Sequence, residues 1–193
     1  MPPAIPTLVT ARLQLRPLCL ADAPAVQQAF SHWDIVQFLS SVIPWPYPKD
    51  GSLTFIREIA LPAMARGTAW HWSIRPAEAP DRLIGVISLQ DEPDNNRGFW
   101  LAAAWRGRGL ATEASVAVTD FWFETLGRPV LRVPKAIANT PSRRISESSF
   151  MRVVASVERD YVSGRLPAEL WEITREEWQA RPRRRPPAPA GSG

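Results

Sequence analysis

One stretch, residues 97–113, constrains this chain more than any other, and it reads RGFWLAAAWRGRGLATE. It begins as an extended apolar run, passes through three alanines into a turn with two glycines, and continues as a helical pattern to Trp122. A strand, a tight glycine loop and a helix start form an anion site, because loop N–H groups and the helix dipole converge. Gly107 and Gly109 let the backbone approach a ligand closely. The stretch predicts a phosphate site, although such a turn can also serve chain geometry alone.

The loop differs from the two common nucleotide-binding loops. No Lys-Ser or Lys-Thr pair follows the glycines, and the third glycine of the dinucleotide fingerprint is missing. The hexapeptide RGRGLA at 106–111 instead fits the [Gln/Arg]-x-x-Gly-x-[Gly/Ala] signature of the GNAT-type N-acetyltransferases. The longer string WRGRGLATEA resembles the branch that acetylates the N-termini of ribosomal proteins, the Rim type. The opening TARLQLRPLCLADA and the closing LWEITREEW resemble this branch too, so the likeness extends over residues 7–180.

This resemblance implies the fold and the cosubstrate. The fold would be α/β (α+β), with a mixed, mostly antiparallel, twisted central sheet that is flanked by helices and splayed at a cofactor gap. Acetyl-CoA would bind there, its pantetheine arm along the backbone of Trp100, Leu101 and Ala102, which would also polarise the carbonyl. The pyrophosphate would bind the loop residues Arg106, Gly107, Arg108, Gly109, Leu110, Ala111 and Thr112.

Asn139 opens a second motif, NTPSRR, which resembles the family's N-x-x-S-R-R. The resemblance implies that Asn139 and Arg143 bind acetyl-CoA, and that Ser142 lies near the sulfur and protonates the leaving thiolate. Many relatives place a tyrosine on this helix, but the two tyrosines here, Tyr47 and Tyr161, lie elsewhere. Ser142 is therefore the acid candidate, although it could equally cap the helix that starts there.

The sequence leaves the general base open. A base must take a proton from the amine, and we retain Glu92, just after a predicted strand, as the candidate. Glu113 could simply complement the helix dipole, and His71 between two tryptophans is typical of a packed strand residue. The full set of options is Asp91, Glu92, Asp94, Glu113, Glu172, His71 and a water relay.

Three further features concern prolines and one missing glycine. The hexapeptide IPWPYP at 43–48 cannot be regular structure, and its Trp45 and Tyr47 either bind substrate or cover the edge of the core. Pro134 predicts an interruption or bulge in its strand. The family's Gly-Phe pair is Ser149-Phe150 here, which predicts a strained backbone at Ser149.

The remaining patterns predict a single domain over residues 1–180. Asp22 and Ser52 are expected to cap helices, Pro62 to bend or shorten one, and Gly67 and Gly127 to end helices. Strands are predicted at 11–20, 70–75, 83–90, 97–102, 130–138, 152–162 and 169–174. Helices are predicted at 22–30, 34–40, 52–66, 112–126, 141–148 and 175–180.

Composition excludes several classes. The single cysteine, Cys19, rules out an internal disulfide, and no His/Cys cluster has zinc spacing, so no metal is expected. Without a signal peptide or an apolar run long enough to span a membrane, we expect a cytoplasmic protein and no membrane partner. The Arg/Pro-rich tail, 181–193, is predicted to be disordered. Its four arginines account for the whole net charge of +4, so the body is not predicted to bind nucleic acid.

We therefore predict an enzyme that moves an acetyl group from acetyl-CoA directly to a primary amine. The acceptor would be a protein N-terminus or a small-molecule amine, and Cys19 is too far from the motif in sequence to suggest an acyl-enzyme. Two other classes stay open: a non-catalytic acyl-CoA-binding protein, and a ribosome- or RNA-associated module that uses the tail. The oligomeric state is not given, and a homodimer is one option.

Overall fold

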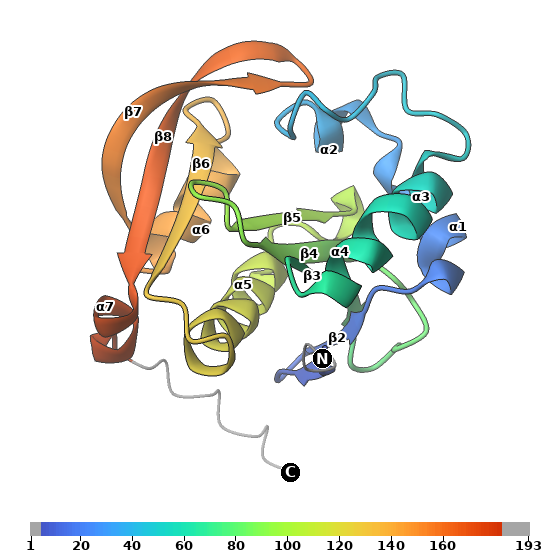
Figure 1. Ribbon diagram of the computed structural model, residues 1–193. Helices are drawn as coiled ribbons and strands as arrows, with labels where there is room; N and C mark the ends of the chain where they lie inside the picture. Colours follow the sequence, from blue (N-terminus) through green and yellow to red (C-terminus); the bar gives the residue numbers. More distant parts are fainter. Residues whose placement is uncertain (1–4, 183–193) are drawn as a thin grey trace, which may run out of the picture.

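The computed structural model describes residues 5–182 and contains two antiparallel sheets (Figure 1). The first sheet has the order β1-β2-β3-β4-β5, with β1 Leu8–Val9, β2 Leu13–Pro17, β3 Ala69–Pro76, β4 Gly85–Gln90 and β5 Arg97–Leu101. The second has the order β6-β8-β7, with β6 Val130–Ala136, β7 Arg152–Tyr161 and β8 Gly164–Thr174. The predicted α+β class is confirmed. Only the two-residue β1 was missed, because it is too short to show alternation.

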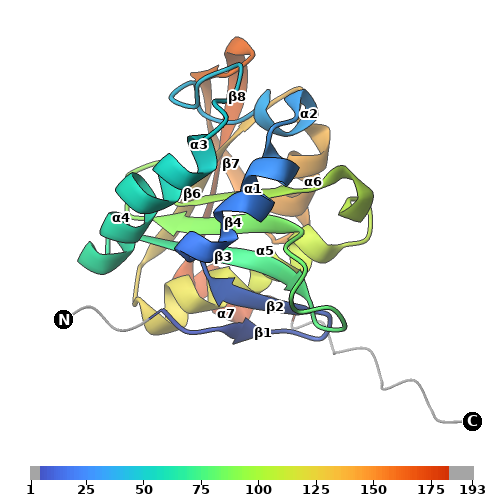
Figure 2. The same ribbon diagram turned by 90° about the vertical axis from the view of Figure 1, so that its right-hand side faces the viewer.

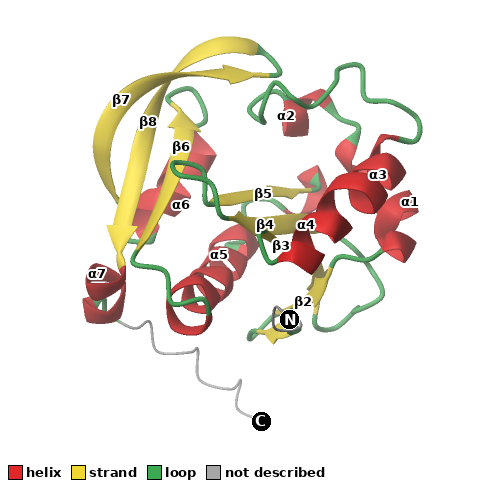
Figure 3. Cartoon of the chain, viewed as in Figure 1, coloured by secondary structure: helices red, strands yellow, loops and turns green. Residues whose placement is uncertain are grey.

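The helices are distributed over both sheets, as Figures 2 and 3 show. Helices α1, α3 and α4 cover one face of the first sheet, and α5 packs on the opposite face against β2, β4 and β5. Helix α6 contacts β6, and α7 follows β8. Their bounds are α1 Ala23–Phe30, α2 Trp33–Val36, α3 Gly51–Thr54, α4 Leu61–Arg66, α5 Leu110–Asp120, α6 Thr140–Ser148 and α7 Arg175–Ala180. The helix predicted at 34–40 is thus a single turn.

Strand alternation divides the core between the two faces of the first sheet. On β3, Trp70 and Trp72 point toward the π-helical segment Phe121–Thr125 that continues α5. Their rings form edge-on contacts with Trp122 and Phe121, at 6.3 and 5.3 Å between centroids. On the opposite face, the Trp100 ring lies 5.3 Å from that of Phe30 on α1. Because both faces of β3 to β5 are covered, these strands are rigid supports for anything built at their ends.

Pro62 does not shorten its helix, which keeps nearly the predicted extent of 52–66. The helix runs from Gly51 to Arg66 without a break, because a π-helical segment, Phe55–Ala60, joins α3 to α4. The wider turn accommodates the proline ring, which would otherwise press on the carbonyl of Glu58. Gly67 ends the helix in the left-handed region, as predicted. Ser52 is not the cap, since it lies inside the first turn, 3.3 Å from the Tyr47 hydroxyl.

Two other local predictions are wrong. Asp22 occupies the position before α1 but does not cap it, because its carboxylate accepts the N–H of Cys19 and pairs with Arg75. Ser149 has an ordinary φ of −94°, and the left-handed residue is Phe150, with φ 60°. The strain of about 1–2 kcal/mol that a side chain suffers there therefore lies one residue later than expected.

Candidate active site

The two sheets meet at one point, which defines a gap between β5 and β6. The N–H of Asn96 donates to the carbonyl of Arg132 at 2.7 Å, and the N–H of Arg132 donates to the Asn96 Oδ1 at 2.7 Å. Beyond this junction β5 and β6 no longer pair, and the strands diverge (Figure 1). The splay thus exposes the backbone edges of two neighbouring strands inside the protein.

The register shows which backbone groups of β5 face the gap. The N–H of Ala102 donates to the carbonyl of Ile84 at 2.9 Å, so Ala102 and, two residues earlier, Trp100 turn their polar groups toward β4. Phe99 and Leu101 consequently face the gap, and the Leu101 carbonyl accepts from Arg106 Nε at 2.9 Å. The free edge is therefore formed by Phe99 and the N–H of Leu101. Sequence reasoning missed Phe99, although strand alternation combined with a known pairing partner could have found it.

The same alternation accounts for Pro134. The N–H of Arg132 points toward β5, so the nitrogen of Pro134, two residues on, also faces the gap. The missing N–H costs no bond with β8, and the register of β6 with β8 runs through Pro134 without a shift. The predicted bulge is therefore wrong there, and the irregularity lies between Val153 and Ala155 of β7 instead.

The glycine loop follows β5 directly. Gly107 and Gly109 have φ of 73° and 75°, and α5 begins at Leu110, two residues earlier than predicted. A side chain at Gly107 would meet nothing within 4 Å, so the loop is open to a ligand. The first N–H groups of α5 have no partner inside the helix. They lie at the positive end of the helix dipole, which favours the binding of a phosphate.

Arg12, the residue just before β2, holds the glycine loop in place. Its Nη1 donates to the Arg108 carbonyl at 2.9 Å, and its Nε and backbone N–H donate to the Glu113 carboxylate at 2.7 and 2.8 Å. Thr10 donates to the same carboxylate at 2.6 Å. Burial alone would raise the pKa of Glu113, but the hydrogen bonds from Thr10 and Arg12 and the charge of Arg12 lower it. Glu113 therefore anchors the loop rather than offering a free base.

The two loop arginines differ in how far they are engaged. Besides its bond to the β5 carbonyl, Arg106 pairs with Asp34 at 2.6 Å. Arg108 is exposed, and its guanidinium lies 5.1 Å from the centroid of the Trp105 ring, which Arg82 contacts from 5.2 Å. Arg108 forms no ion pair in the described part of the chain, so its charge is available to an anion.

On α6, the capping role belongs to Asn139. Its Oδ1 accepts the N–H of Ser142 at 3.3 Å, so Ser142 is not the cap. The Ser142 side chain is only 8% exposed, and within residues 5–182 its hydroxyl has no hydrogen-bond partner. Arg143 donates to both carboxylate oxygens of Glu169, at 2.8 and 3.0 Å. Fewer of its N–H donors are therefore available to a ligand than the sequence implied.

A cleft of about 530 Å³ lies at the gap and is lined by residues on both faces of the sheet. Residues from both strands line it, together with the start of α6: Gly98, Phe99, Trp100, Lys135, Asn139 and Ser142. The cleft therefore brings together the predicted strand and α6 residues, which are far apart in sequence. A side chain at Gly98 would meet nothing within 4 Å, so this glycine keeps the floor of the cleft open.

One side of the cleft is suited to an amine. Phe55 and Ile59 of the π-helical segment face His71 and Ser88 on the sheet. His71 Nδ1 lies 2.7 Å from the Ser88 hydroxyl, and burial lowers the pKa of His71 to about 4. This histidine is consequently neutral near pH 7. Glu92 lies at one end of the same cleft.

The candidate bases are not equally available. Asp91 pairs with Arg128 at 2.6 Å, Asp94 with Arg132, and Glu172 with Arg132 and Arg152. Glu92 forms no ion pair among the described residues, and its carboxylate accepts one hydrogen bond, from Asn95 at 3.3 Å. Of the acids considered from the sequence, Glu92 is thus the least engaged.

Trp45 and Tyr47 do not line this cleft. The Tyr47 ring packs 4.9 Å from that of Phe30, and burial, partly offset by its hydrogen bond to Ser52, raises the pKa of Tyr47. Trp45 is 40% exposed and its ring lies 5.5 Å from that of Trp33. Tyr47 therefore belongs to the core edge, whereas Trp45 remains open to a substrate role.

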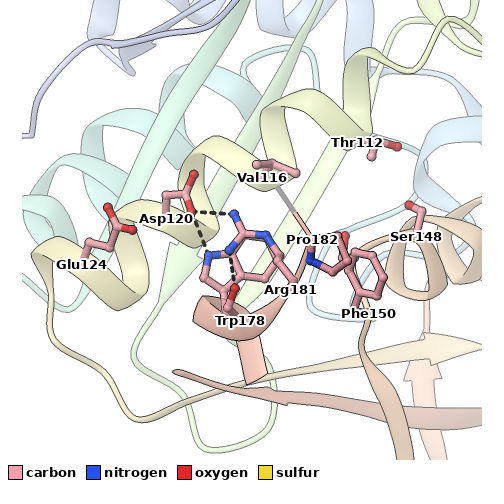
Figure 4. Close-up of a pocket in the computed structure, with 10 residues that line it drawn as sticks. Thr112, Val116, Asp120, Glu124, Ser148, Phe150, Trp178, Arg181 and Pro182 are labelled. Carbon is pink, nitrogen blue, oxygen red and sulfur yellow. Dashed lines mark hydrogen bonds and ion pairs between the residues drawn. The ribbon is translucent and has the colours of Figure 1, made fainter. Parts of the chain in front are cut away.

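A smaller pocket of about 300 Å³ lies between α5 and the C-terminal segment (Figure 4). Asp120 accepts from Trp178 Nε1 at 2.8 Å and pairs with Arg181 at 2.9 Å, and Thr112 lies at the far end. No group of three or more potential metal ligands occurs among residues 5–182. In the same range no helix has the length and apolarity to cross a membrane.

Fold and site together define a class of protein. A strand pair that splays beside a glycine loop, with a helix N-terminus behind the loop, is the arrangement expected for an acyl-CoA-dependent transferase. The chain belongs to the GNAT acetyltransferase family, because the family's acetyltransferase (GNAT) domain matches residues 12–152.

One curated protein and several solved structures are similar to this chain. YdaF of Bacillus subtilis (strain 168), which carries a provisional assignment as a ribosomal N-acetyltransferase, is 28% identical over 104 residues; the match spans 50% of this chain and 56% of that protein. The ribosomal-protein-S5-alanine acetyltransferase of Vibrio fischeri superposes with a TM-score of 0.76 at 12% identity, over 90% of this chain and 98% of the other. An acetyltransferase of Agrobacterium tumefaciens str. C58 has a TM-score of 0.68 at 26% identity, with 90% and 96% covered.

Proposed function

We propose that this chain transfers the acetyl group of acetyl-CoA to a primary amine by direct attack on the thioester. The observation that carries the proposal is the free strand edge of Phe99 and Leu101, which opens into a cleft lined by residues on both faces of the sheet. An extended pantetheine arm can pair with such an edge as an added strand does. A backbone N–H there can polarise the thioester carbonyl.

The remaining parts would act in sequence along the cosubstrate. The open loop and the first N–H groups of α5 would bind the pyrophosphate, with Arg108 as an additional cation. The side-chain NH₂ group of Asn139 would bind the arm, while its Oδ1 accepts the N–H of Ser142 and caps α6. An acyl-enzyme is not needed: Cys19 is exposed and does not line the cleft.

The amine would enter from the opposite side of the sheet. Apolar Phe55 and Ile59 would contact the group that carries the amine. The carboxylate of Glu92, which lines the cleft and has no ion pair among the described residues, would attract its positive charge. We assign Glu92 the removal of a proton, directly or through water. The names of the relatives favour a protein N-terminus as acceptor, with a small amine as the alternative. The cytoplasmic location and a homodimer stay predictions from sequence.

The first test is binding. Acetyl-CoA at about 100 times its dissociation constant should stabilise the protein by roughly 2.7 kcal/mol, seen as a rise in melting temperature. Gly109→Val should abolish that rise, because φ 75° and the approach of a ligand exclude a side chain. Gly127→Val is the matched control, since Gly127 has φ 68° at the far end of the same helical segment. No rise in the wild-type protein would refute the proposal.

The second test separates an enzyme from a binding protein. Glu92→Gln should leave the acetyl-CoA-induced rise unchanged while slowing thiol release in the presence of an amine by about 10²-fold or more. Asn95→Ala, next to it, removes only the partner of that carboxylate and should retain most of the rate. A wild-type protein that binds acetyl-CoA but releases no thiol with any amine would favour the non-catalytic acyl-CoA-binding alternative.

A further inference from the structure

The splay contains a buried cation, Lys135. Lys135, on the gap-lining strand β6, is only 8% exposed. Its Nζ lies 5.1 Å from the centroid of the Phe99 ring across the gap, and within residues 5–182 it has no hydrogen bond or ion pair. Lys135 shares the cleft with Asn139 and Ser142. A buried, unpaired ammonium is costly to fold, so its presence in a binding cleft calls for a function.

The choice of residue type is informative in this chain. Of the 23 cationic side chains, only Lys49 and Lys135 are lysines. Lys49 is exposed, so the single buried lysine is the one in the gap. An arginine would supply the charge but could not release a proton, whereas a lysine shifts its pKa readily when buried.

The neighbouring charges do not neutralise Lys135. On β5, Arg97 is 2% exposed, and its Nη1 donates to Thr119 of α5 at 2.7 Å. Glu169, opposite Lys135 in the ladder with β8, is bound by Arg143 of α6. Burial first, and the charge of Arg97 second, lower the pKa of Lys135 to about 7. Two cations thus adjoin a cleft in which no described carboxylate pairs with either.

We propose that Lys135 is the proton donor to the CoA thiolate that leaves when the acetyl group is transferred, a role that rests on the proposed function. The amine nitrogen attacks the carbonyl carbon, and the C–S bond then breaks with its electron pair on sulfur. The Lys135 ammonium gives a proton to that sulfur, producing CoA thiol. The new amide nitrogen loses its extra proton to the base, and the neutral Lys135 regains one from water.

The structure favours Lys135 over the other candidates for this step. A serine hydroxyl such as that of Ser142 gives up a proton far less readily than an ammonium. Tyr161 lines the cleft too, and its buried hydroxyl has no partner in the described chain. However, burial raises the pKa of Tyr161, and its ring packs with Ala136, whose side chain points to the opposite face of β6 from Lys135. Lys135 and Arg97 share the face that carries α5, where the glycine loop would admit the cosubstrate.

The experiment measures the charge state of bound CoA. Wild-type protein mixed with CoA near pH 7.5 should show little of the ultraviolet difference absorbance of a thiolate, because the sulfur holds the proton that Lys135 gives up. Acetyl-CoA, whose sulfur cannot ionise, is the blank. Lys135→Met should bind acetyl-CoA and also give little thiolate signal. Lys135→Arg should give a strong thiolate signal, because arginine stabilises the thiolate but cannot give it a proton. Lys49→Met, the exposed lysine, should behave as wild type.

Turnover supplies the second readout. Lys135→Met and Lys135→Arg should each slow kcat by about 10²-fold or more at neutral pH, because neither side chain can give up a proton. The decline of the wild-type rate above the pKa of Lys135 should disappear in both variants. The melting temperature of Lys135→Met should not fall, since the change removes a buried charge. If acetyl-CoA binds and turns over but wild-type and Lys135→Arg proteins have equal kcat and equal thiolate signals, the proposal for Lys135 is overturned and the acetyltransferase proposal stands. If acetyl-CoA does not bind at all, the proposed function itself is wrong.

Discussion

His71 lies on β3 between two buried tryptophans, yet its own side chain points to the opposite face, toward the cleft. There it contacts the Ser88 hydroxyl and the edge of the Phe55 ring, 5.7 Å between centroids. No carboxylate is near enough to hold a proton on it, so burial dominates and the pKa falls to about 4. A neutral imidazole can accept or donate one hydrogen bond to a substrate, but it is too weak a base to hold the proton of an amine.

The titration of His71 predicts a pH dependence of stability. The unfolded chain takes up a proton near pH 6.5, whereas the native protein does so only near pH 4. Stability is therefore complete above pH 6.5 and falls as the pH drops toward 4, by up to roughly 3 kcal/mol from this residue. The free energy of unfolding in urea, measured between pH 7 and 4, should change less with pH for His71→Gln than for the wild-type protein. His32→Gln, a change at the other histidine, should keep the wild-type slope; equal slopes for all three proteins would contradict the assignment.

The junction of β5 and β6 is the element-scale feature on which the site depends. Asn96, just before β5, is 5% exposed, and its carbonyl accepts the N–H of Gln90. It forms two more hydrogen bonds with Arg132, and its Nδ2 donates to the carbonyls of Gln90 and Glu92, at 3.3 and 2.6 Å. Its side chain thus closes the narrow end of the splay and also shapes the loop that carries the proposed base. The gap beyond it stays open because no further backbone bond joins the two strands.

Removal of the Asn96 side chain should loosen this junction. Asn96→Ala leaves the buried N–H of Arg132 without its 2.7 Å acceptor, so we expect a loss of about 1–3 kcal/mol in the free energy of unfolding. Binding of acetyl-CoA should weaken as well, because the angle between the strands is no longer fixed. Asn95→Ala is the neighbouring control, since Asn95 forms a single weak bond to Glu92. The idea fails if both variants unfold at the same denaturant concentration as the wild-type protein.

At the scale of the whole molecule, the C-terminal segment ties the second sheet to α5. Trp178 of α7 is buried, and its indole N–H donates to Asp120 at 2.8 Å. Arg181 stacks on the Trp178 ring, with its guanidinium carbon 3.3 Å from the centroid, and pairs with the same Asp120 (Figure 4). Arg181 therefore packs with the body, while residues 183–193, the rest of the predicted tail, lie outside the described chain. The domain boundary at residue 180 stays a prediction.

Two truncations test where the folded body ends. A chain that ends at Pro182 should have the same melting temperature as the full-length protein, because every described contact is kept. A chain that ends at Ala180 loses the stacking and ion pair of Arg181, which together should lower the stability by about 1 kcal/mol. The Pro182 truncation also removes three tail arginines, so any salt-sensitive binding of RNA should vanish with it. Equal melting of the two truncated chains would show that Arg181 contributes nothing measurable.

The sequence by itself determined the order of strands and helices, the glycine loop and the family, because periodicity and glycine positions are properties of neighbouring residues. The tertiary structure alone decided which groups are available. In the folded protein, the backbone of Phe99, and not that of Trp100, faces the gap, and Glu113 pairs with Arg12. Asn139 caps α6, and Lys135 is buried without a hydrogen bond or ion pair among the described residues. Charge pairing and burial depend on contacts between residues far apart in the chain, and the pattern of neighbouring residues in the sequence does not predict those contacts.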